Sequence, residues 1–322
     1  MLKTRVGVLR GGPSSEHDIS FKTGANVLKN LSEKYQPVDI FIDKSGTWHV
    51  HGIASTPEKI FKKVDVLFNA LHGDYGEDGG IQHLLDTFKI PYTGSGRLSS
   101  AFAMHKGHTK KLLKAHGIKS PYHKIVHKDQ VTKETIHDLF RSIPHPSVVK
   151  PVSKGSSLGV SVVLGFLDFE EALQKAFTLG PAVMIEEYIS GREATCGVLE
   201  AFRDESLYAF FPAEVVLDPS QKFFNFDAKY GGKSRIVHPG RFSRLEMETI
   251  KNFSRIAHQV LGLRHYSRSD FIVHSSRGVY FLETNSLPGL SVNAPYVESL
   301  SSVGTPFSHF IDHVLKLALE GK

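Results

Sequence analysis

The sequence predicts a mixed fold class, with an N-terminal doubly wound α/β domain followed by an α+β region of helices packed on antiparallel sheets. Two observations support this. Up to about residue 95, apolar strand-like runs alternate with turn and helix signals. From residue 147 onward, short β-rich segments follow one another with few helices between them. At 322 residues, 40% of them hydrophobic, the chain is long enough for two or three domains with cores of their own.

The first elements form a strand, a tight turn and a helix. Residues 5–10 are apolar enough for a buried strand, which ends at Gly11-Gly12-Pro13. Ser14 and Ser15 are candidate N-caps for a helix that reaches about Leu31. The other predicted elements of a domain over residues 1–95 are strands at 38–42 and 64–71 and a glycine-rich loop at 72–80.

A domain boundary is predicted at the turn 91–96, where proline and glycine interrupt the pattern. A helical stretch then carries Lys106 and continues to Ala115, and Gly117 follows in the position of a C-terminal cap. We expect two further units, over residues 96–185 and 186–322.

Short strands dominate the rest of the chain. They are predicted at 147–152, 160–166, 182–189, 194–201 and 207–217. Helices are predicted near 169–179, 243–261 and 306–319, and the last two frame two final strands. The segment 218–239 is too long for a simple connection, which makes it a candidate lid.

Composition excludes several classes of protein. No stretch approaches the ~20 consecutive apolar residues of a membrane-spanning helix. Met1-Leu2-Lys3 runs almost directly into the first strand, which leaves no room for a signal peptide. The single cysteine, Cys196, permits neither an internal disulfide nor a cysteine-based zinc site. We therefore expect a cytoplasmic protein that does not bind membranes.

The charge pattern does not favour nucleic-acid binding. The 39 basic and 33 acidic residues give a net charge of +6, but the basic residues are scattered rather than gathered in a stripe. An anionic small substrate explains this balance equally well. The 18 histidines mostly stand singly in polar segments, so they are interpreted as surface residues.

Three glycine motifs match known patterns only in part. The segment 155–159 has the Gly-x-Ser-x-Gly form of a hydrolase nucleophile elbow, but a strand follows it where a helix is required. Gly231-Gly232-Lys233-Ser234 resembles the end of a P-loop, yet Asp227 stands where its first glycine belongs. Gly94-x-Gly96 lacks the third glycine of a dinucleotide fingerprint and is explained by a turn.

The strongest constellation lies on the last predicted hairpin. If Ser276-Arg277 is a two-residue turn, Asp270 faces Glu283 and Arg268 faces Asn285, all on one face of the sheet. Two carboxylates ~4 Å apart repel by roughly 4 kcal/mol at an effective dielectric of about 20. A hard divalent cation would compensate, and magnesium also binds substrate phosphates. The alternative is an exposed hairpin whose charges lie in water and are neutralised by Arg268.

A second set of residues is suited to phosphates. Lys150 at a strand end precedes a loop whose glycines, Gly155 and Gly159, free backbone N–H groups to approach a polyanion. Lys106 and Lys229 come from separate elements and could converge with it, although each lysine alone is typical of a surface. The apolar strand 184–189, which ends in acidic groups, suits an adenine edge and a ribose diol.

Together these residues resemble an ATP-grasp enzyme, specifically the D-alanine–D-alanine ligase family, from the first strand to the last helix. The matching segments are Gly11-Gly12-Pro13-Ser14-Ser15-Glu16, Leu71-His72-Gly73 with Gly76-Glu77-Asp78-Gly79, Pro91-Tyr92-Thr93-Gly94-Ser95-Gly96, Val149-Lys150-Pro151, Gly155-Ser156-Ser157-x-Gly159, Asp227-Ala228-Lys229-Tyr230, Arg268-x-Asp270 and Glu283-x-Asn285-x-x-Pro288-Gly289. The resemblance implies a pre-ATP-grasp N-terminal domain and a two-part ATP-grasp module.

The resemblance also implies a role for individual residues. The phosphates of the nucleotide would be bound by Lys106, Lys150 and Lys229, with Ser157 in the phosphate loop. Adenine would be bound by Glu186, Glu187 and the Ile189 backbone, and ribose by Glu193. Two Mg²⁺ (or Mn²⁺) ions fall to Asp270, Glu283 and Asn285. In catalysis, Glu16 would bind the ammonium of the first D-alanine, and Arg268 and the Gly289 backbone would stabilise the oxyanion. Ser156 and Tyr230 would hold the lid closed over the site.

The activity so implied is ATP-dependent ligation of two D-alanines through an acyl phosphate, for peptidoglycan synthesis, in a homodimer. Two positions depart from the family. His105 replaces an aspartate, and Ala294 replaces a serine that helps to bind the second substrate. The second departure keeps another acceptor open, such as D-serine, D-lactate or a different amine, although Tyr230 argues against D-lactate. A non-catalytic nucleotide-binding protein is the alternative from another class.

Overall fold

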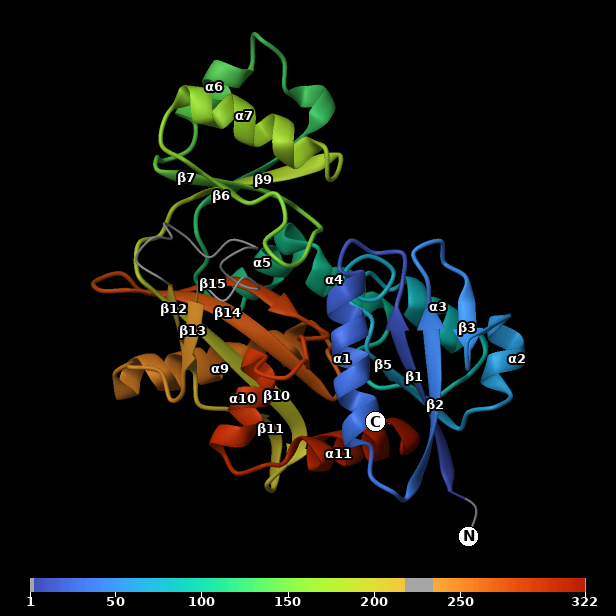
Figure 1. The fold of residues 1–322 in the computed structure, drawn as a ribbon. Coiled ribbons are helices and arrows are strands. Elements are labelled where there is room, and N and C mark those ends of the chain that lie inside the picture. Colours follow the sequence, from blue (N-terminus) through green and yellow to red (C-terminus); the bar gives the residue numbers. More distant parts are fainter. Residues whose placement is uncertain (1–2, 218–233, 322) are drawn as a thin grey trace.

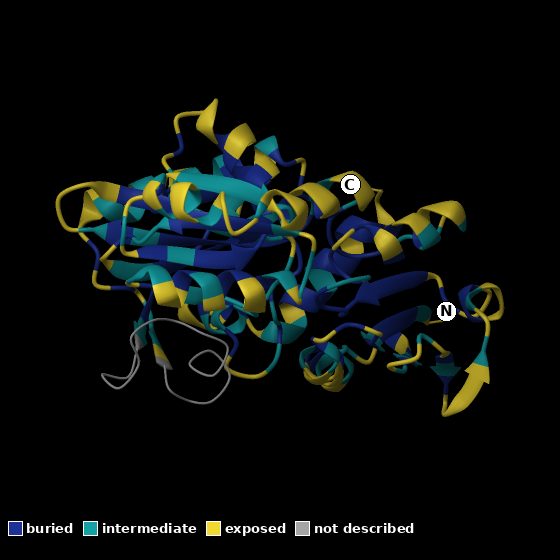
Figure 2. Ribbon diagram, turned by 90° about the horizontal axis from the view of Figure 1, so that it is seen from above, coloured by how far each residue is buried: buried dark blue, intermediate teal, exposed yellow. Residues whose placement is uncertain are grey.

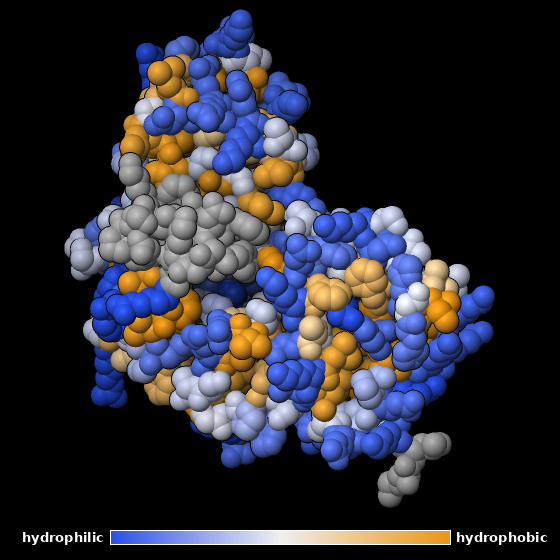
Figure 3. Space-filling view, in the orientation of Figure 1, coloured by the Kyte–Doolittle hydropathy of each residue, from blue (hydrophilic) through white to orange (hydrophobic). Residues whose placement is uncertain are grey.

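The computed structural model describes residues 3–217 and 234–321, which form three β-sheets with helices packed on them (Figure 1). In Figure 2 the strands are mostly buried, and exposed residues lie on the outer helices and loops. On the face shown in Figure 3, hydrophobic residues form small groups among hydrophilic ones. Within the described ranges, no helix is long and apolar enough to cross a membrane.

The first sheet has the strand order β4-β3-β2-β1-β5. Its strands are β1 (Thr4–Gly11), β2 (Tyr35–Ile42), β3 (Trp48–Val50), β4 (Ile53–Ser55) and β5 (Val66–Asn69). Strands β1, β2 and β5 are parallel, and β3 and β4 add an antiparallel edge. Side chains alternate along β1, so that Val8 packs with helix α1 (His17–Asn30) on one face and Leu9 packs with α3 (Gly80–Thr87) on the other. The short helix α2 (Pro57–Phe61) lies on the same side as α3. The doubly wound prediction is confirmed.

The turn after β1 differs from its prediction in the position of the helix start. Helix α1 begins at His17 with Glu16 as its N-cap residue, so Ser14 and Ser15 are not the caps. Instead, the Ser14 hydroxyl accepts a hydrogen bond from the Glu16 N–H at 2.8 Å. Gly11 has φ +88°, and a Cβ there would lie 2.2 Å from the Ile42 carbonyl oxygen, so only glycine fits. This turn places the Glu16 carboxylate at the carboxyl edge of the sheet.

The predicted helix through Lys106 is two helices, α4 (Arg97–Met104) and α5 (Lys106–Lys114). They break at His105, which is extended and whose ring accepts a hydrogen bond from the His108 N–H at 3.2 Å. The Thr109 hydroxyl donates to the Phe102 carbonyl at 2.7 Å, which also accepts the His105 N–H at the end of α4. The break makes Lys106 the first residue of α5, where its N–H donates to the Val152 carbonyl.

The second sheet is antiparallel, in the order β6-β9-β7-β8. Its strands are β6 (His123–His127), β7 (Ser147–Pro151), β8 (Ser161–Val163) and β9 (Ala182–Glu187). The sheet is covered by α6 (Ile136–Arg141) and α7 (Phe166–Phe177), and the short 3-10 helix η1 (Lys128–Gln130) follows β6. Helix α7 starts before the predicted residue 169 because the Asp168 carboxylate accepts the N–H groups of Leu164 and Gly165.

The third sheet is also antiparallel, in the order β13-β12-β10-β14-β15, with β11 paired to β10. Its strands are β10 (Arg192–Phe202), β11 (Glu205–Ala209), β12 (Ala213–Leu217), β13 (Ser234–Val237), β14 (Tyr266–His274) and β15 (Gly278–Asn285). The single strand predicted at 207–217 is wrong, because Pro212 has no N–H for the ladder and separates β11 from β12. Strand β13 occupies part of the predicted loop 218–239; residues 218–233 lie outside the described residues.

The last helices connect the sheets. Helix α9 (Arg244–Val260) packs on the third sheet, and α10 (Pro295–Ser302) leads to α11 (Phe307–Leu319). Helix α11 returns to the first sheet, where Phe310 and Val314 share a core with Val8 and Phe68 (Figure 1). The C-terminal helix therefore stabilises the N-terminal sheet. The domain boundaries at 95 and 185 stay a prediction.

Candidate active site

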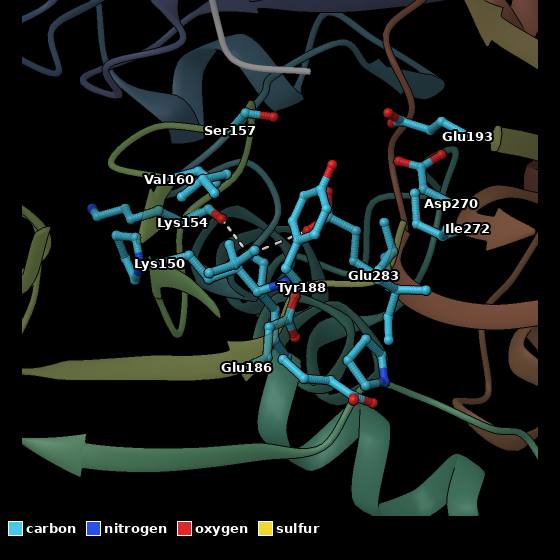
Figure 4. A pocket seen from close by; sticks show the side chains of 18 of the residues that line it. Lys150, Lys154, Ser157, Val160, Glu186, Tyr188, Glu193, Asp270, Ile272 and Glu283 are labelled. Atoms are coloured by element: carbon cyan, nitrogen blue, oxygen red, sulfur yellow. Dashed lines mark hydrogen bonds and ion pairs between the residues drawn. The ribbon is translucent and has the colours of Figure 1, made fainter. Parts of the chain in front are cut away.

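The largest recess of the site lies between the second and third sheets, and we call it the nucleotide pocket. Among its lining residues are nine that the sequence predicts for nucleotide or metal: Lys106, Lys150, Ser157, Glu186, Glu187, Ile189, Glu193, Asp270 and Glu283. Figure 4 shows Lys150 and Ser157 on one side of it and Glu193 and Asp270 on the opposite side. Residues from two different sheets thus face one another across one space.

A smaller recess, the amino-acid pocket, adjoins the first sheet. It is lined by five residues that the sequence predicts for catalysis or metal, which are Glu16, Ser156, Arg268, Asn285 and Gly289. His72 and Glu77 line it too, although the sequence analysis assigned them no role. Lys106, Glu283 and Asn285 also line a third small recess beside these two. Two predicted residues, Lys229 and Tyr230, lie outside the described residues.

The hairpin β14–β15 has the predicted pairing at its functional end. Arg268 pairs with Asn285 and Asp270 with Glu283. The predicted two-residue turn is wrong, however, because His274 pairs with Gly278 and leaves a three-residue connection. The register shifts at a β-bulge between Asp270 and Phe271, opposite Leu282, and this compensates for the extra residue of the turn.

The bulge decides which side chains reach the site. Phe281 packs in the core under the third sheet, and without a bulge Glu283, two residues later, would point the same way. With Leu282 inserted, both Leu282 and Glu283 line the nucleotide pocket, while Phe281 stays buried. The paired carboxylates of Asp270 and Glu283 therefore depend on an irregularity in the strand.

Basic groups compensate the two carboxylates. The Asp270 carboxylate accepts hydrogen bonds from Arg268 Nε and Nη2, at 2.9 and 2.8 Å, and from the Thr195 hydroxyl at 2.6 Å. The Lys106 ammonium lies 3.4 Å from the Glu283 carboxylate. The alternative to a metal site was an exposed hairpin whose charges Arg268 neutralises. Arg268 does neutralise Asp270, but the hairpin is not exposed here, because Arg268 is 5% and Asp270 9% exposed.

The donor atoms here fit a divalent cation of the hard type. Asp270, Glu283 and Asn285 present two carboxylates and an amide on one face of the hairpin, and the Asn285 amide nitrogen donates to Asp270 Oδ2 at 3.3 Å. Over the described ranges, no group of three or more His, Cys, Asp or Glu side chains is placed to hold a metal alone. A magnesium-like ion bound by few protein ligands and by substrate phosphates agrees with this donor set.

Glu186 lies between two lysines at the inner end of the nucleotide pocket. Its two oxygens form ion pairs with Lys150 and with Lys110, a residue that the sequence analysis did not single out. Burial opposes the charge on Glu186, but the two ammonium groups outweigh it and lower the pKa of this carboxyl to about 2. Burial lowers the pKa of Lys110 to about 8, although Glu186 partly opposes this shift. Glu186 is therefore an anion in a buried, cationic setting.

The loop between β7 and β8 joins the two pockets. Ser156 and Ser157 have positive φ of 49° and 56°, and the chain then enters β8, so the hydrolase elbow is absent as predicted. The Ser156 hydroxyl donates to the Glu16 carboxylate, and a Cβ on Gly155 would lie 2.6 Å from Glu16 Oε1. Lys154 pairs with Asp74 of the glycine-rich loop, and its carbonyl accepts from Lys106 Nζ at 2.5 Å.

His72 and Glu77 stand in segments that the sequence analysis quotes, but it gave neither residue a role. The Glu77 carboxylate accepts the Gly73 N–H at 2.7 Å and lies 4.0 Å from His72, whose other ring nitrogen is 2.9 Å from the Thr23 hydroxyl. Burial and the nearby Glu16 carboxylate raise the pKa of Glu77 to about 8. A signal was present, because loops that follow neighbouring parallel strands such as β1 and β5 meet at one edge.

Known sequences match this chain over nearly its whole length. The family models described as D-ala D-ala ligase N-terminus and C-terminus match residues 5–60 and 53–95, and residues 112–316, respectively. A D-alanine–D-alanine ligase of Geotalea uraniireducens is 37% identical over 98% of this chain and 96% of its own length. One of Pelotomaculum thermopropionicum is 34% identical over 98% and 97%. The chain belongs to the D-alanine–D-alanine ligase family.

Solved structures of this family have the same fold. The D-alanine–D-alanine ligase of Coxiella burnetii is 26% identical, covers 99% of this chain and 94% of its own, and superposes with a TM-score of 0.84. The VanG D-Ala:D-Ser ligase of Enterococcus faecalis is 27% identical, covers 98% and 100%, and has a TM-score of 0.85. The predicted ATP-grasp fold is confirmed. Members named for different acceptors resemble this ligase equally, so overall fold does not identify the acceptor.

Proposed function

We propose that this ligase joins two D-alanines to D-alanyl-D-alanine, with ATP converted to ADP and phosphate. Relatives named D-alanine–D-alanine ligase over nearly the whole chain support the reaction. The observation that carries the proposal is the junction of the two pockets, where Ser156 binds Glu16 and Lys106 lies beside Glu283. A nucleotide phosphate and an amino-acid carboxylate would meet there.

In the first step, the carboxylate of one D-alanine attacks the γ-phosphorus of ATP, and ADP leaves with the electron pair of the broken P–O bond. Glu16 would hold the ammonium of this D-alanine as an ion pair. Lys106, Lys150 and Lys229 would neutralise the phosphates, and Ser157 belongs to the loop that surrounds them. Glu186, Glu187 and the Ile189 backbone would bind adenine, and Glu193 the ribose.

In the second step, the amine of another D-alanine attacks the carbonyl carbon of the acyl phosphate. The tetrahedral intermediate carries an oxyanion, which Arg268 and the Gly289 N–H would stabilise. Collapse expels phosphate and leaves the peptide bond, and the amine proton passes to solvent or phosphate. Because water would destroy the acyl phosphate, Ser156 and Tyr230 would help to close the site over it.

Asp270, Glu283 and Asn285 would hold two Mg²⁺ or Mn²⁺ ions, which would offset phosphate charge and polarise the transferred group. We also propose that the ligase is a cytoplasmic homodimer that supplies peptidoglycan synthesis, with the N-terminal domain at the subunit interface. Residues 1–95, 96–185 and 186–322 would be its N-terminal domain and its two ATP-grasp lobes.

The test measures phosphate release from ATP and magnesium with D-alanine, L-alanine, D-lactate or D-serine, each alone and in pairs with D-alanine. Mass spectrometry identifies the products. We expect D-alanyl-D-alanine as the main product and no turnover on L-alanine. A mixed dipeptide or depsipeptide as the main product would overturn the acceptor assignment but keep the mechanism. No turnover in any mixture would overturn the catalytic function.

A further inference from the structure

Lys110 is a buried charge that the reaction described above does not use. It lies four residues after Lys106 on α5, so both lysines project from the same side of this helix. Its side chain is 0% exposed, and its ammonium contacts Glu186 Oε2. Lys110 does not line the nucleotide pocket, whereas Glu186 and Lys150 do. Any effect of Lys110 on a bound nucleotide would therefore pass through Glu186.

The two lysines on Glu186 have unequal surroundings. β7 pairs Val148 with Glu186, and Lys150 is two residues farther along the same face, where it reaches Glu186 Oε1 from the pocket side. Lys150 is also a proposed phosphate ligand, so a bound nucleotide would share its charge. Lys110 does not line the pocket, so a bound nucleotide would leave its ion pair with Glu186 in place. A buried carboxylate needs such a partner, because an unpaired charge in a protein interior is strongly destabilising.

The protonation state of Glu186 decides what kind of base it accepts. An ionised carboxylate only accepts hydrogen bonds, while a protonated carboxyl also donates one. A purine with an amino group at position 6 donates to an acceptor, and a purine with a carbonyl there does not. An anionic Glu186 therefore favours a 6-aminopurine and repels the carbonyl oxygen of a 6-oxopurine.

We propose that Lys110 is a positioning residue that keeps Glu186 as an anionic acceptor at the base, and that it thereby sets the preference for adenine over 6-oxopurine nucleotides. This inference rests on the proposed function, in which Glu186 binds adenine. Lys110 contributes to specificity without touching the nucleotide. Its loss changes which base is bound more than it changes the chemistry at the phosphates.

The test compares ATP with inosine triphosphate, which has a carbonyl at position 6. Both binding by calorimetry and KM and kcat for ligation are measured on the full chain. We expect Lys110→Met to weaken ATP binding about tenfold while inosine triphosphate changes less than about threefold, with kcat on ATP within about threefold. Lys110→Arg should keep most of the preference. Lys111→Met, at the exposed neighbouring lysine, is the matched control and should behave like the wild type.

Glu186→Gln keeps the proposal testable if Lys110→Met does not fold. An amide both donates and accepts, so this variant should lose the preference for ATP over inosine triphosphate. Adding Lys110→Met to Glu186→Gln should cause no further change in that preference. An unchanged ATP to inosine triphosphate ratio in Lys110→Met, or equal losses on both nucleotides, would overturn the proposal. Failure of the proposed function is distinguishable, because calorimetry reports base preference even if the wild type forms no dipeptide.

Discussion

The two ends of the active site are built differently. At the nucleotide end, the buried charges lie on regular elements, with Glu186 on β9, Lys150 on β7 and Lys110 on α5. At the amino-acid end, Glu16, Glu77 and Ser156 lie in turns or loops that come from different sheets. The charges at the nucleotide end are therefore fixed by two strands of one sheet and a helix, whereas the amino-acid pocket depends on loops from two sheets.

This difference suits the order of the chemistry. Reading a base needs fixed hydrogen-bond geometry, which strands and helices provide. Joining two amino acids needs a site that excludes water and then releases product, which loops permit. Substitutions at one end, at a group that both ends share, or at the connection between them therefore test whether the two ends function independently.

The largest effect is expected where both ends depend on one group. Glu283 lines the nucleotide pocket, pairs with Lys106 and belongs to the proposed metal set. Glu283→Gln removes one anionic ligand and should lower kcat by about 10²–10³-fold, with the fold retained. Circular dichroism and steady-state phosphate release check this. Glu205→Gln, at a half-exposed surface ion pair, is the control, and unchanged turnover in Glu283→Gln would refute the metal assignment.

The free energy of unfolding should depend on pH through Glu77 in the amino-acid pocket. Burial and Glu16 raise the pKa of Glu77 from 4.5 to about 8, so between these values the native state binds more protons than the unfolded chain. The free energy of unfolding therefore falls as pH rises through this window, by on the order of a few kcal/mol. Glu77→Gln should remove this contribution. Denaturant unfolding of both proteins from about pH 5 to 8 measures it, and parallel curves would contradict the assignment.

If the two ends are independent, a substitution in the amino-acid pocket should change the KM for D-alanine and not the KM for ATP. Glu16 contacts Ser156 in the amino-acid pocket and is not among the residues of the nucleotide pocket. Glu16→Gln should raise the KM for the first D-alanine about 10- to 100-fold, because a charge-assisted hydrogen bond is lost, and should leave the KM for ATP nearly unchanged. Initial rates with each substrate varied measure both constants. Equal losses for the two substrates would show that the ends are coupled through Glu16.

Much of this site is predictable from sequence because it depends on periodicity and on short motifs. Strand alternation places Arg268, Asp270, Glu283 and Asn285 on one face, and the structure agrees. The reason for that register was not predictable. A bulge at Leu282 offsets a longer turn, and bulges leave little trace in a single sequence.

Other features depend on contacts between distant segments. Lys110 looks like any surface lysine in sequence, yet it is buried because α5 packs on β15 and α9 and its ammonium meets Glu186, 76 residues later in the chain. Glu77 gains its environment from Glu16, on another loop of the same sheet edge. Partners of this kind follow from tertiary packing, which local patterns do not encode.

A smaller effect is expected at the start of α10, at the position where the sequence comparison predicts a family serine. Ala294 is the N-cap residue, with extended backbone angles and no side-chain cap. Ala294→Ser supplies an oxygen for the first free N–H groups of the helix and should stabilise the protein by about 1 kcal/mol. It should also lower the KM for the second D-alanine a few-fold if the hydroxyl reaches its carboxylate. Thermal unfolding and acceptor kinetics test this, and Ala294→Gly, which adds no hydroxyl, is the control.

The smallest effect concerns the connection between the ends. Lys154, in the loop next to the proposed phosphate site, pairs with Asp74 of the glycine-rich loop that follows β5, and their side chains are 26% and 44% exposed. Partly exposed ion pairs contribute about 0–1 kcal/mol, so Asp74→Lys or Lys154→Asp alone should lower kcat/KM by no more than about fivefold. Exchanging both charges restores attraction, and the double variant should recover the rate.

That charge exchange tests the ion pair of Lys154 and Asp74 by itself, because it changes no proposed ligand of either substrate. If the pair holds the phosphate loop over the D-alanine, the single variants should raise the KM for both substrates together, and added salt should reduce the difference from the wild type. Recovery in the double variant would then show that the two ends communicate through this loop. Additive losses in the double variant would mean that Lys154 and Asp74 act separately, and that Ser156 with Glu16 is the connection that matters.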